Sequence, residues 1–114
     1  MFEILKIDKI KRGRLYSLKV GEREIKILFT FHAVERTKTW NLKDEYVISA
    51  ILYPEEVLVG HRNRFIAHRR RGRHLIRAVY ECDDKMLPVV IIVYYPYKER
   101  YFKGGKTFAN KILP

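Results

Sequence analysis

The sequence predicts an α+β domain in which two helices pack on one face of a twisted antiparallel sheet. Most of the chain consists of short segments with alternating apolar residues, separated by residues that form turns. Between these segments, near the middle of the chain, lie stretches with helical periodicity. A length of 114 residues with 47% hydrophobic content is enough for one core. We therefore expect a single domain over residues 1–114.

Strands are predicted at the N-terminus, where apolar and polar residues alternate with some interruptions. Turn-forming residues at positions 11–13 and 21–22 separate the segments Phe2–Ile10, Arg14–Val20 and Arg23–Phe29. Connections this short require neighbouring strands to run antiparallel. Residues 1–25 are thus expected to form a meander that is added to the rest of the domain.

Helices are predicted to follow this meander. Thr30 is a suitable N-cap for a helix over Phe31–Trp40, because its hydroxyl can accept a hydrogen bond from an amide of the first turn. Asn41 is followed three residues later by Asp44, a spacing that predicts the cap of a second helix. That helix extends to about residue 52 and buries an apolar stripe.

The remainder of the chain predicts further antiparallel strands. Turn-forming residues such as Asn63, Gly72 and Asp83 separate them. Residues 88–93 are apolar on both faces, a pattern typical of a central strand. The strands are expected at Glu56–Val59 or as far as Arg62, Phe65–Arg70, His74–Glu81 and Val89–Tyr95.

Positive charge is concentrated in one part of the chain. The net charge is +11, and residues 57–80 contain arginines and no acidic residue. Guanidinium groups bind phosphate oxygens in pairs and stack on bases, so this region predicts a nucleic-acid-binding surface whose affinity falls steeply with salt. A solvated face or a docking surface for an acidic protein is the alternative. The expected RNA-binding residues are Arg62, Arg64, Arg69, Arg70, Arg71, Arg73, Arg100 and Lys103.

His32 and Arg36 are the pair most typical of an enzyme. They lie four residues apart on the predicted helix and therefore on the same side of it. A histidine can move a proton near neutral pH, and an adjacent arginine can bind a scissile phosphate and stabilise its developing charge. The alternative is a structural histidine that makes a local hydrogen bond in the first turn of the helix.

Other classes of site and location are not expected. His61, His68 and His74 are irregularly spaced among arginines that would repel a dication, so we expect no metal and no cofactor. Cys82 is the single cysteine, which excludes an internal disulfide and suits a reducing compartment. The sequence contains no apolar stretch of about 18 residues and no secretory leader, which predicts a cytoplasmic protein without membrane contact.

The segment Phe29–Arg36, with the sequence F-T-F-H-A-V-E-R, resembles a family of small prokaryotic domains. The family pattern is F-T-x-H-A-x-x-R, and the family is related to the RelE/ParE and BrnT toxins. The resemblance covers about residues 26–97 and continues through Tyr53–Val57, Arg64–Ala67 and Leu75–Glu81. It implies a RelE-like fold for residues 26–97, with the N-terminal β-meander as an extra element and residues 98–114 as a basic tail.

The resemblance also implies a function. It implies the toxin of a type II toxin-antitoxin pair, an endoribonuclease that acts on mRNA, including ribosome-bound mRNA, without a metal and that an acidic antitoxin protein silences. A non-catalytic nucleic-acid-binding module, in which His32 is structural, is one alternative. A toxin of the same fold that inhibits a protein target is another.

The implied ribonuclease suggests roles for particular residues. His32 would act as general acid or base, while Arg36 and Arg77 would bind the phosphate. The second proton carrier would be Tyr80, Tyr97 or His68, because attack by a 2′-hydroxyl needs one group that takes a proton and another that gives one. Arg77 and Tyr80 point to opposite faces of one predicted strand, so these residues cannot all lie in one site.

Overall fold

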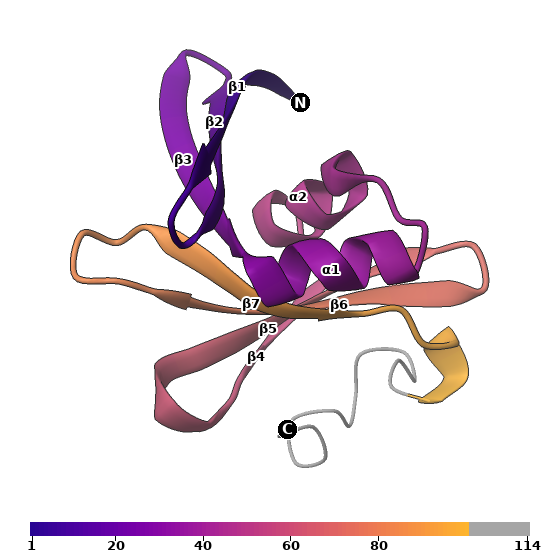
Figure 1. Cartoon of the computed structure of the whole chain (residues 1–114). Coiled ribbons are helices and arrows are strands. Elements are labelled where there is room, and N and C mark those ends of the chain that lie inside the picture. The colour runs from indigo at the N-terminus through magenta and orange to yellow at the C-terminus, as the bar shows by residue number, and fades with distance from the viewer. Residues whose placement is uncertain (101–114) are drawn as a thin grey trace.

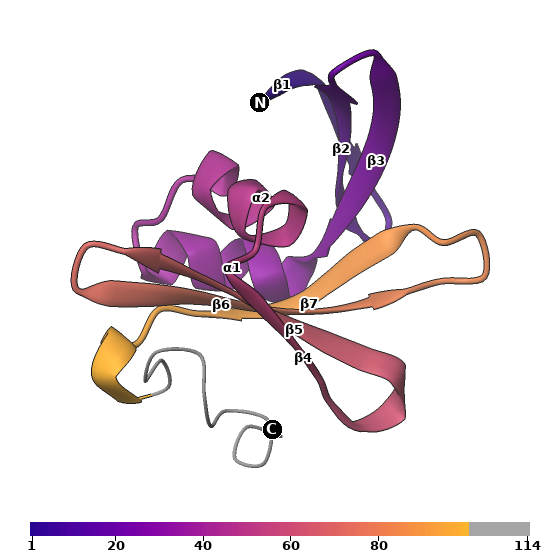
Figure 2. The ribbon, with the colours of Figure 1, turned by 180° about the vertical axis from the view of Figure 1, so that it is seen from behind.

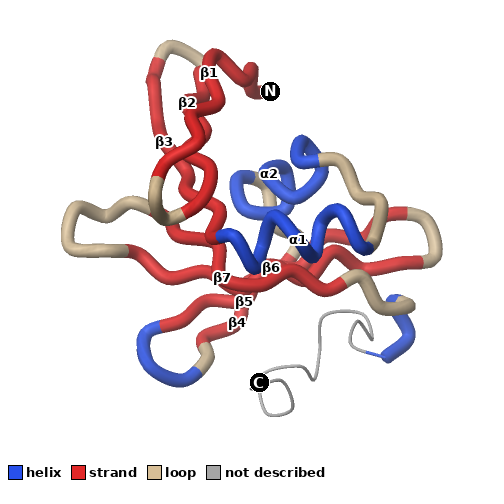
Figure 3. Tube along the Cα trace, viewed as in Figure 1, coloured by secondary structure: helices blue, strands red, loops and turns tan. Residues whose placement is uncertain are grey.

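Alternating apolar residues form seven strands in the computed structural model, which describes residues 1–100 of the chain (Figure 1). The strands are β1 (Phe2–Ile10), β2 (Gly13–Val20), β3 (Arg23–Thr30), β4 (Glu56–Val59), β5 (Arg64–Arg71), β6 (His74–Cys82) and β7 (Pro88–Tyr94). The helices are α1 (Phe31–Thr39) and α2 (Asp44–Leu52), with short 3-10 turns η1 (His61–Asn63) and η2 (Lys98–Arg100). Figure 3 shows where these helices and strands lie in the fold.

All the strands belong to a single sheet with the order β1-β2-β3-β7-β6-β5-β4. Neighbouring strands are antiparallel except β3 and β7, which are parallel, with Leu28 beside Val89 and Phe29 beside Val90. The strand with the longest apolar run, β7, is therefore in the middle of the order, as its pattern predicts. The sheet is mixed, because this one parallel pairing joins the N-terminal strands to the C-terminal strands.

The predicted fold class, a RelE-like antiparallel sheet with two helices and an extra N-terminal β-meander, is wrong. Strands make up 55% of the structure against 23% for helices, in one mixed seven-stranded sheet. The strands β1 to β3 are not an addition, since Tyr16, Leu18 and Ile27 are fully buried in the same core as both helices. The error has a physical cause: the contact between β3 and β7 joins distant segments, and no local periodicity reports it.

Local hydrogen bonds explain where the helices begin and end. The Thr30 hydroxyl accepts a hydrogen bond from the Ala33 amide at 3.2 Å, which confirms the predicted cap of α1. The predicted cap of α2 is wrong, because Lys43 occupies that position and Asn41 has a φ of 52°. Asn41 instead ends α1: its amide donates to the Lys38 carbonyl, and the Leu42 amide donates to the Thr37 carbonyl. This pairing is the Schellman motif, in which asparagine tolerates the left-handed position.

Both helices lie on one side of the sheet, and β1 to β3 rise beside them (Figures 1 and 2). The side of the sheet that faces the helices is concave, and the main core lies between it and the helices. A separate small cluster lies on the other side of the sheet. That second cluster consists of the buried residues Ile66 and Val79 with Leu58, Ile92 and Tyr94 packed against them. The sheet therefore has one face covered by helices and one helix-free face. No helix within residues 1–100 has the length and apolar character needed to span a membrane.

Candidate functional site

A row of polar side chains crosses the helix-free face of the sheet. Glu56 of β4 pairs with His68 of β5, which pairs with Arg77 of β6, and Arg77 in turn pairs with Tyr94 of β7. Residues directly opposite one another in paired strands share a face. Tyr94 packs with the Ile66 and Val79 cluster, so the whole row lies on that helix-free side.

Hydrogen bonds connect the first three members of the row. Oε2 of Glu56 lies 2.8 Å from Nδ1 of His68, and Nε2 of His68 lies 3.2 Å from Nη1 of Arg77. A guanidinium group can only donate, so Nε2 must accept this hydrogen bond. The ring proton then lies on Nδ1, which donates it to the Glu56 carboxylate. Neighbours on both sides therefore determine the tautomer of His68.

Burial sets the protonation of this chain of hydrogen bonds. His68 is fully buried, and Arg77 is only 5% exposed. Burial, with the positive charge of Arg77 as a second cause, lowers the pKa of His68 to about 4, so its imidazole is neutral at pH 7. Burial also raises the pKa of the Glu56 carboxyl, and the neighbouring Glu55 carboxylate raises it further. We refer to Glu56, His68 and Arg77 together as the polar chain.

The polar chain combines groups suited to phosphate chemistry. A guanidinium holds its N–H donors in a rigid fork that matches two oxygens of a phosphate. The hydrogen bond to His68 orients the guanidinium of Arg77. A neutral imidazole can accept a proton, and the carboxylate of Glu56 would stabilise the imidazolium that results. The arrangement can therefore position an anion and take up a proton next to it.

Two of the predicted proton carriers do not lie in this row. Tyr80 is on the helix-covered face, where its ring stacks on Phe65 with centroids 5.5 Å apart. Burial raises its pKa, with a smaller contribution from Cys82. Tyr97 stacks on His74 at 4.7 Å and is 58% exposed. Of the three predicted carriers, His68 is the one that the structure brings into contact with Arg77.

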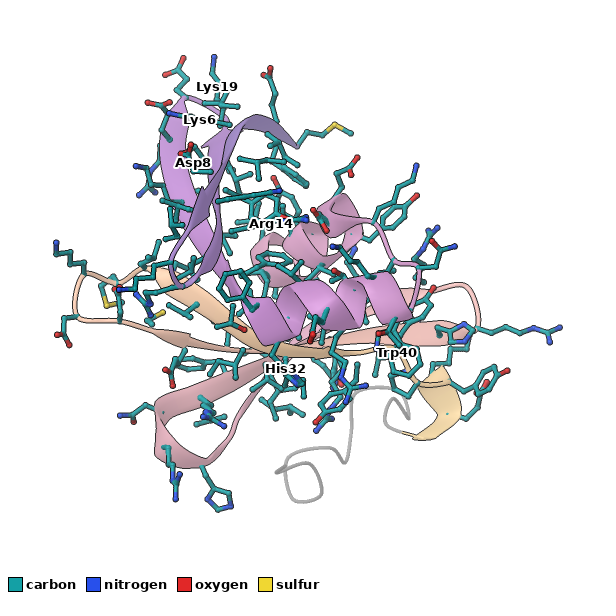
Figure 4. The ribbon with its side chains drawn as sticks, in the orientation of Figure 1. Lys6, Asp8, Arg14, Lys19, His32 and Trp40 are labelled. Atoms are coloured by element: carbon teal, nitrogen blue, oxygen red, sulfur yellow. The ribbon has the colours of Figure 1, made fainter. Side chains whose placement is uncertain are left out.

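His32 and Arg36 are not part of the polar chain but border β7. They lie on one side of α1, and Trp40, a further four residues on, follows that side. The indole of Trp40 donates to the Val93 carbonyl of β7 at 3.2 Å, so this side of the helix faces the strand. Figure 4 shows His32 at the start of α1 and Trp40 at its end, both beside β7.

The predicted arginine surface is divided between the two faces of the sheet. Arg69 donates to the Tyr53 carbonyl at 2.7 Å, and the guanidinium of Arg71 lies 3.6 Å from the centroid of the Tyr46 ring on α2. Alternation along β5 directs both side chains toward the helices.

The other arginines differ in their surroundings. Arg70 forms an ion pair with Glu55 at 2.7 Å, which lowers the pKa of that carboxyl, and Arg73 is exposed in the turn between β5 and β6. Arg62 and Arg64 lie at the opposite end of β5. Arg100 is the last residue of η2, and Lys103 lies outside the described residues.

Sequence reasoning missed Glu56 and Tyr94 as members of the site. Each is unremarkable in the sequence, because Glu56 is one of two adjacent acids and Tyr94 belongs to an aromatic run. The signal that identifies them is the register, which places Glu56 opposite His68 and Tyr94 opposite Arg77. A register of the hairpins, derived from their turn lengths, would have been needed to find them.

Comparisons of this chain with protein-family models, with curated proteins and with solved structures find no match. Within residues 1–100, no three side chains of His, Cys, Asp or Glu are grouped closely enough to hold a metal ion. The features of this protein that bear on its function are the polar chain, the net charge and the resemblance of the sequence around His32.

Proposed function

We propose that this protein is the toxin of a type II toxin-antitoxin pair and cleaves mRNA as a metal-independent endoribonuclease. The observation that carries the proposal is the polar chain, in which an oriented guanidinium contacts an imidazole that is neutral at pH 7. The F-T-x-H-A-x-x-R pattern around His32 and its resemblance to toxin-related domains support the same function.

In the proposed reaction, the 2′-oxygen of a ribose attacks the adjacent phosphorus, and the bond from phosphorus to the 5′-oxygen breaks. The products are a 2′,3′-cyclic phosphate and a 5′-hydroxyl. Nε2 of His68 takes the proton of the 2′-hydroxyl once the guanidinium of Arg77 moves onto the phosphate, and Glu56 stabilises the imidazolium. The leaving 5′-oxygen takes a proton from water, and we assign His32 and Arg36, which border β7 on α1, to binding of the RNA.

The proposal assigns the neutralisation of charge in the transition state to arginine. A guanidinium held in a buried, low-dielectric site interacts more strongly with a developing charge than it would in water. Arg77 can in this way supply the positive charge that a divalent ion supplies in other nucleases. The proposed reaction therefore needs no metal ion.

The net charge supports the proposed partners. A charge of +11 on 114 residues favours binding to polyanions, of which RNA is one, and to an acidic antitoxin protein. Cellular mRNA as the substrate implies that the protein acts in the cytoplasm.

The test is cleavage of single-stranded RNA in the presence of EDTA, together with growth and mapped RNA 5′ ends after induced expression. We expect Arg77→Ala and His68→Ala to reduce cleavage about a hundredfold or more, which is typical for loss of an acid-base or charge-stabilising group. Because both side chains are buried, His32→Ala on exposed helix surface is the second variant. Arg12→Ala, in the exposed turn before β2, is the control for loss of an arginine.

The outcomes separate the proposal from its rivals. New 5′-hydroxyl ends with wild-type protein, lost in the site variants and kept in the control, would support the ribonuclease. Cleavage that EDTA abolishes and Mg²⁺ restores would contradict metal independence. Growth arrest without new RNA ends would favour a toxin that acts on a protein.

A non-catalytic RNA-binding module is the second candidate. Its support is the polar chain itself, since Nε2 of His68 already accepts a hydrogen bond and both side chains are buried, as in a structural polar network. RNA binding without cleavage would establish this reading and overturn the proposed reaction.

A further inference from the structure

A cavity of about 480 Å³ lies next to the polar chain on the helix-free face of the sheet. It is lined by Gly60, His61, Arg62, Arg64, Ile66 and Val79. Ile66 and Val79 are paired across β5 and β6, two residues along their strands from His68 and Arg77. Because side chains two residues apart in a strand share a face, the cavity adjoins the polar chain at a distance of about 7 Å.

The cavity has an apolar floor and a cationic rim. Ile66 is fully buried and Val79 likewise, and together they form the centre of the small cluster on this face. Arg62 and His61 belong to the exposed turn η1, while Arg64 begins β5. An apolar surface bordered by guanidinium and imidazole groups is suited to a ligand that combines a flat, weakly polar ring with an anion.

Arg64 has hydrogen-bonding capacity that its neighbours do not use. Its Nε lies 3.7 Å from Oε2 of Glu81, which is an ion-pair distance but too long for a hydrogen bond. Within residues 1–100 that Nε is buried without a hydrogen-bond partner. An unsatisfied buried donor is costly, and an anionic oxygen bound in the cavity would relieve this cost.

The backbone of the turn is strained at the rim of the cavity. Arg62 has a φ of 59° and Asn63 a φ of 61°, so consecutive residues other than glycine adopt the left-handed conformation. Such a conformation costs on the order of 1 kcal/mol or more for arginine, and strain of this kind is concentrated at binding sites. The hydrogen bond from the Gly60 amide to the Arg64 carbonyl at 2.8 Å closes the turn that carries this strain.

We propose that this cavity binds one nucleotide of a single-stranded RNA, next to the phosphate that Arg77 holds. The base occupies the end of the cavity nearest Ile66 and Val79, and the phosphate accepts hydrogen bonds from Arg62 and Arg64. The choice of RNA as the ligand rests on the proposed function. The cavity adds to that function a binding site for the nucleotide next to the phosphate that Arg77 holds. A free inorganic anion would leave the apolar floor unused, so the base is an essential part of the ligand.

The test measures binding of nucleotides without any cleavage. The four nucleoside 3′-monophosphates, ribose 5-phosphate and inorganic phosphate are titrated into the full chain, and the methyl resonances of Ile66 and Val79 are followed by NMR. We expect at least one nucleotide to shift both methyl groups through the ring current of its base. Ribose 5-phosphate and inorganic phosphate are expected to leave these methyl resonances unchanged.

A matched pair of variants tests the rim. Arg62→Asn removes the guanidinium and keeps a residue that tolerates the left-handed conformation. It is expected to weaken nucleotide binding about tenfold, the effect of losing a charge-assisted hydrogen bond. Arg12→Asn removes the same charge in the turn between β1 and β2 and is expected to leave the affinity unchanged.

Several results would overturn the inference. They are an absence of methyl shifts with every nucleotide, equal shifts with inorganic phosphate, and equal weakening by Arg62→Asn and Arg12→Asn. If RNA is not cleaved but the methyl groups shift, the nucleotide site stands and the proposed ribonuclease fails. If RNA is cleaved but no nucleotide shifts these groups, the ribonuclease stands and the nucleotide site fails.

Discussion

His68 lies between a carboxylate and a guanidinium from the strands on either side of it. Its Nδ1 contacts Glu56, and its Nε2 contacts Arg77. A histidine usually takes up a proton near pH 6.5, but burial and the charge of Arg77 lower the pKa of His68 to about 4. The polar chain therefore links the stability of the fold to pH through this residue.

We predict that His68 makes the folded state less stable as the pH falls from 6.5 toward 4. Unfolded His68 takes up a proton near pH 6.5, whereas folded His68 takes it up near pH 4. The unfolded state thus binds more protons in this window, so acid favours unfolding. The raised pKa of Glu56 acts in the opposite direction, because its folded form binds a proton more readily than its unfolded form.

Urea unfolding of the wild type and of His68→Gln, from about pH 7 down to pH 4, isolates the contribution of His68. The difference in unfolding free energy between the two proteins should shrink as the pH falls, since the variant lacks the titrating ring. His61→Gln, which removes an exposed imidazole, is the control and should follow the wild type. A constant difference between wild type and His68→Gln across this range would contradict the prediction.

The chemistry of single residues predicts only part of the candidate site. Sequence reasoning selected His68 and Arg77 because their side chains can move protons or bind phosphate. It also selected Tyr80, which alternation along β6 directs into the main core. Glu56 could not be selected, because its role depends on the β4–β5 register and not on its own chemistry.

At the scale of elements, Gly13 determines how closely β2 approaches the end of β3. It has a φ of +149°, and a Cβ atom added there would lie 1.9 Å from the carbonyl oxygen of Phe29. Gly21, in the turn between β2 and β3, also has a positive φ of +63° but has nothing within 4 Å of an added Cβ. The two glycines share backbone strain and differ in available space.

We predict that Gly13→Ala destabilises the protein by about 3 kcal/mol or more, because the substitution adds both backbone strain and a clash with a backbone atom. Gly21→Ala, its matched control, adds only strain and should cost about 1 kcal/mol. Urea unfolding of both variants measures the two values. Equal losses would show that the contact with Phe29 does not limit the approach of the strands.

The sequence predicts where a helix begins or ends when that position depends on residues a few places apart in the chain. The Thr30 cap needs only an amide three residues away, and the sequence predicts it correctly. The role of Asn41 is ambiguous in the sequence, because asparagine favours both the start of a helix and the left-handed residue after one. The hydrogen bonds from Asn41 and Leu42 back to α1 decide between these positions.

At the scale of the whole molecule, the N-terminal strands complete the core of the domain. Tyr16 packs on Phe29 with ring centroids 4.7 Å apart, and its hydroxyl donates to Asp44 at the start of α2. Arg14 lies 3.6 Å from the same carboxylate, and Figure 4 shows it between β2 and the helices. These contacts tie β2 to α2 across the concave side of the sheet.

We predict that a chain without residues 1–20 loses cooperative unfolding. The deletion removes Tyr16 and Leu18, both fully buried, and with them the contacts that Tyr16 makes with Phe29 and with Asp44 of α2. Thermal unfolding followed by circular dichroism, together with the dispersion of amide NMR signals, measures the result. A truncated chain that still unfolds cooperatively would show that the meander is a dispensable addition.

The distribution of positive charge over the folded molecule differs from its distribution along the sequence. Residues 57–80 contain arginines and no acid, which predicts one continuous cationic surface. In the structure, Arg69 and Arg71 face the helices, whereas Arg64 and Arg77 lie on the other face. Alternation along a strand separates neighbours in sequence, so charge density along a chain does not measure charge density on a surface.

The sequence by itself determined the strands, the helix α1 with its cap, the central position of β7 and the position of the positive charge along the chain. These features depend on periodicity, turn residues and composition, which act over a few residues. Only the tertiary structure decided that β3 lies beside β7, that Glu56, His68 and Arg77 form one chain, and that the arginines are divided between two faces. Strand partners and register depend on packing between distant segments, and local patterns carry no record of that packing.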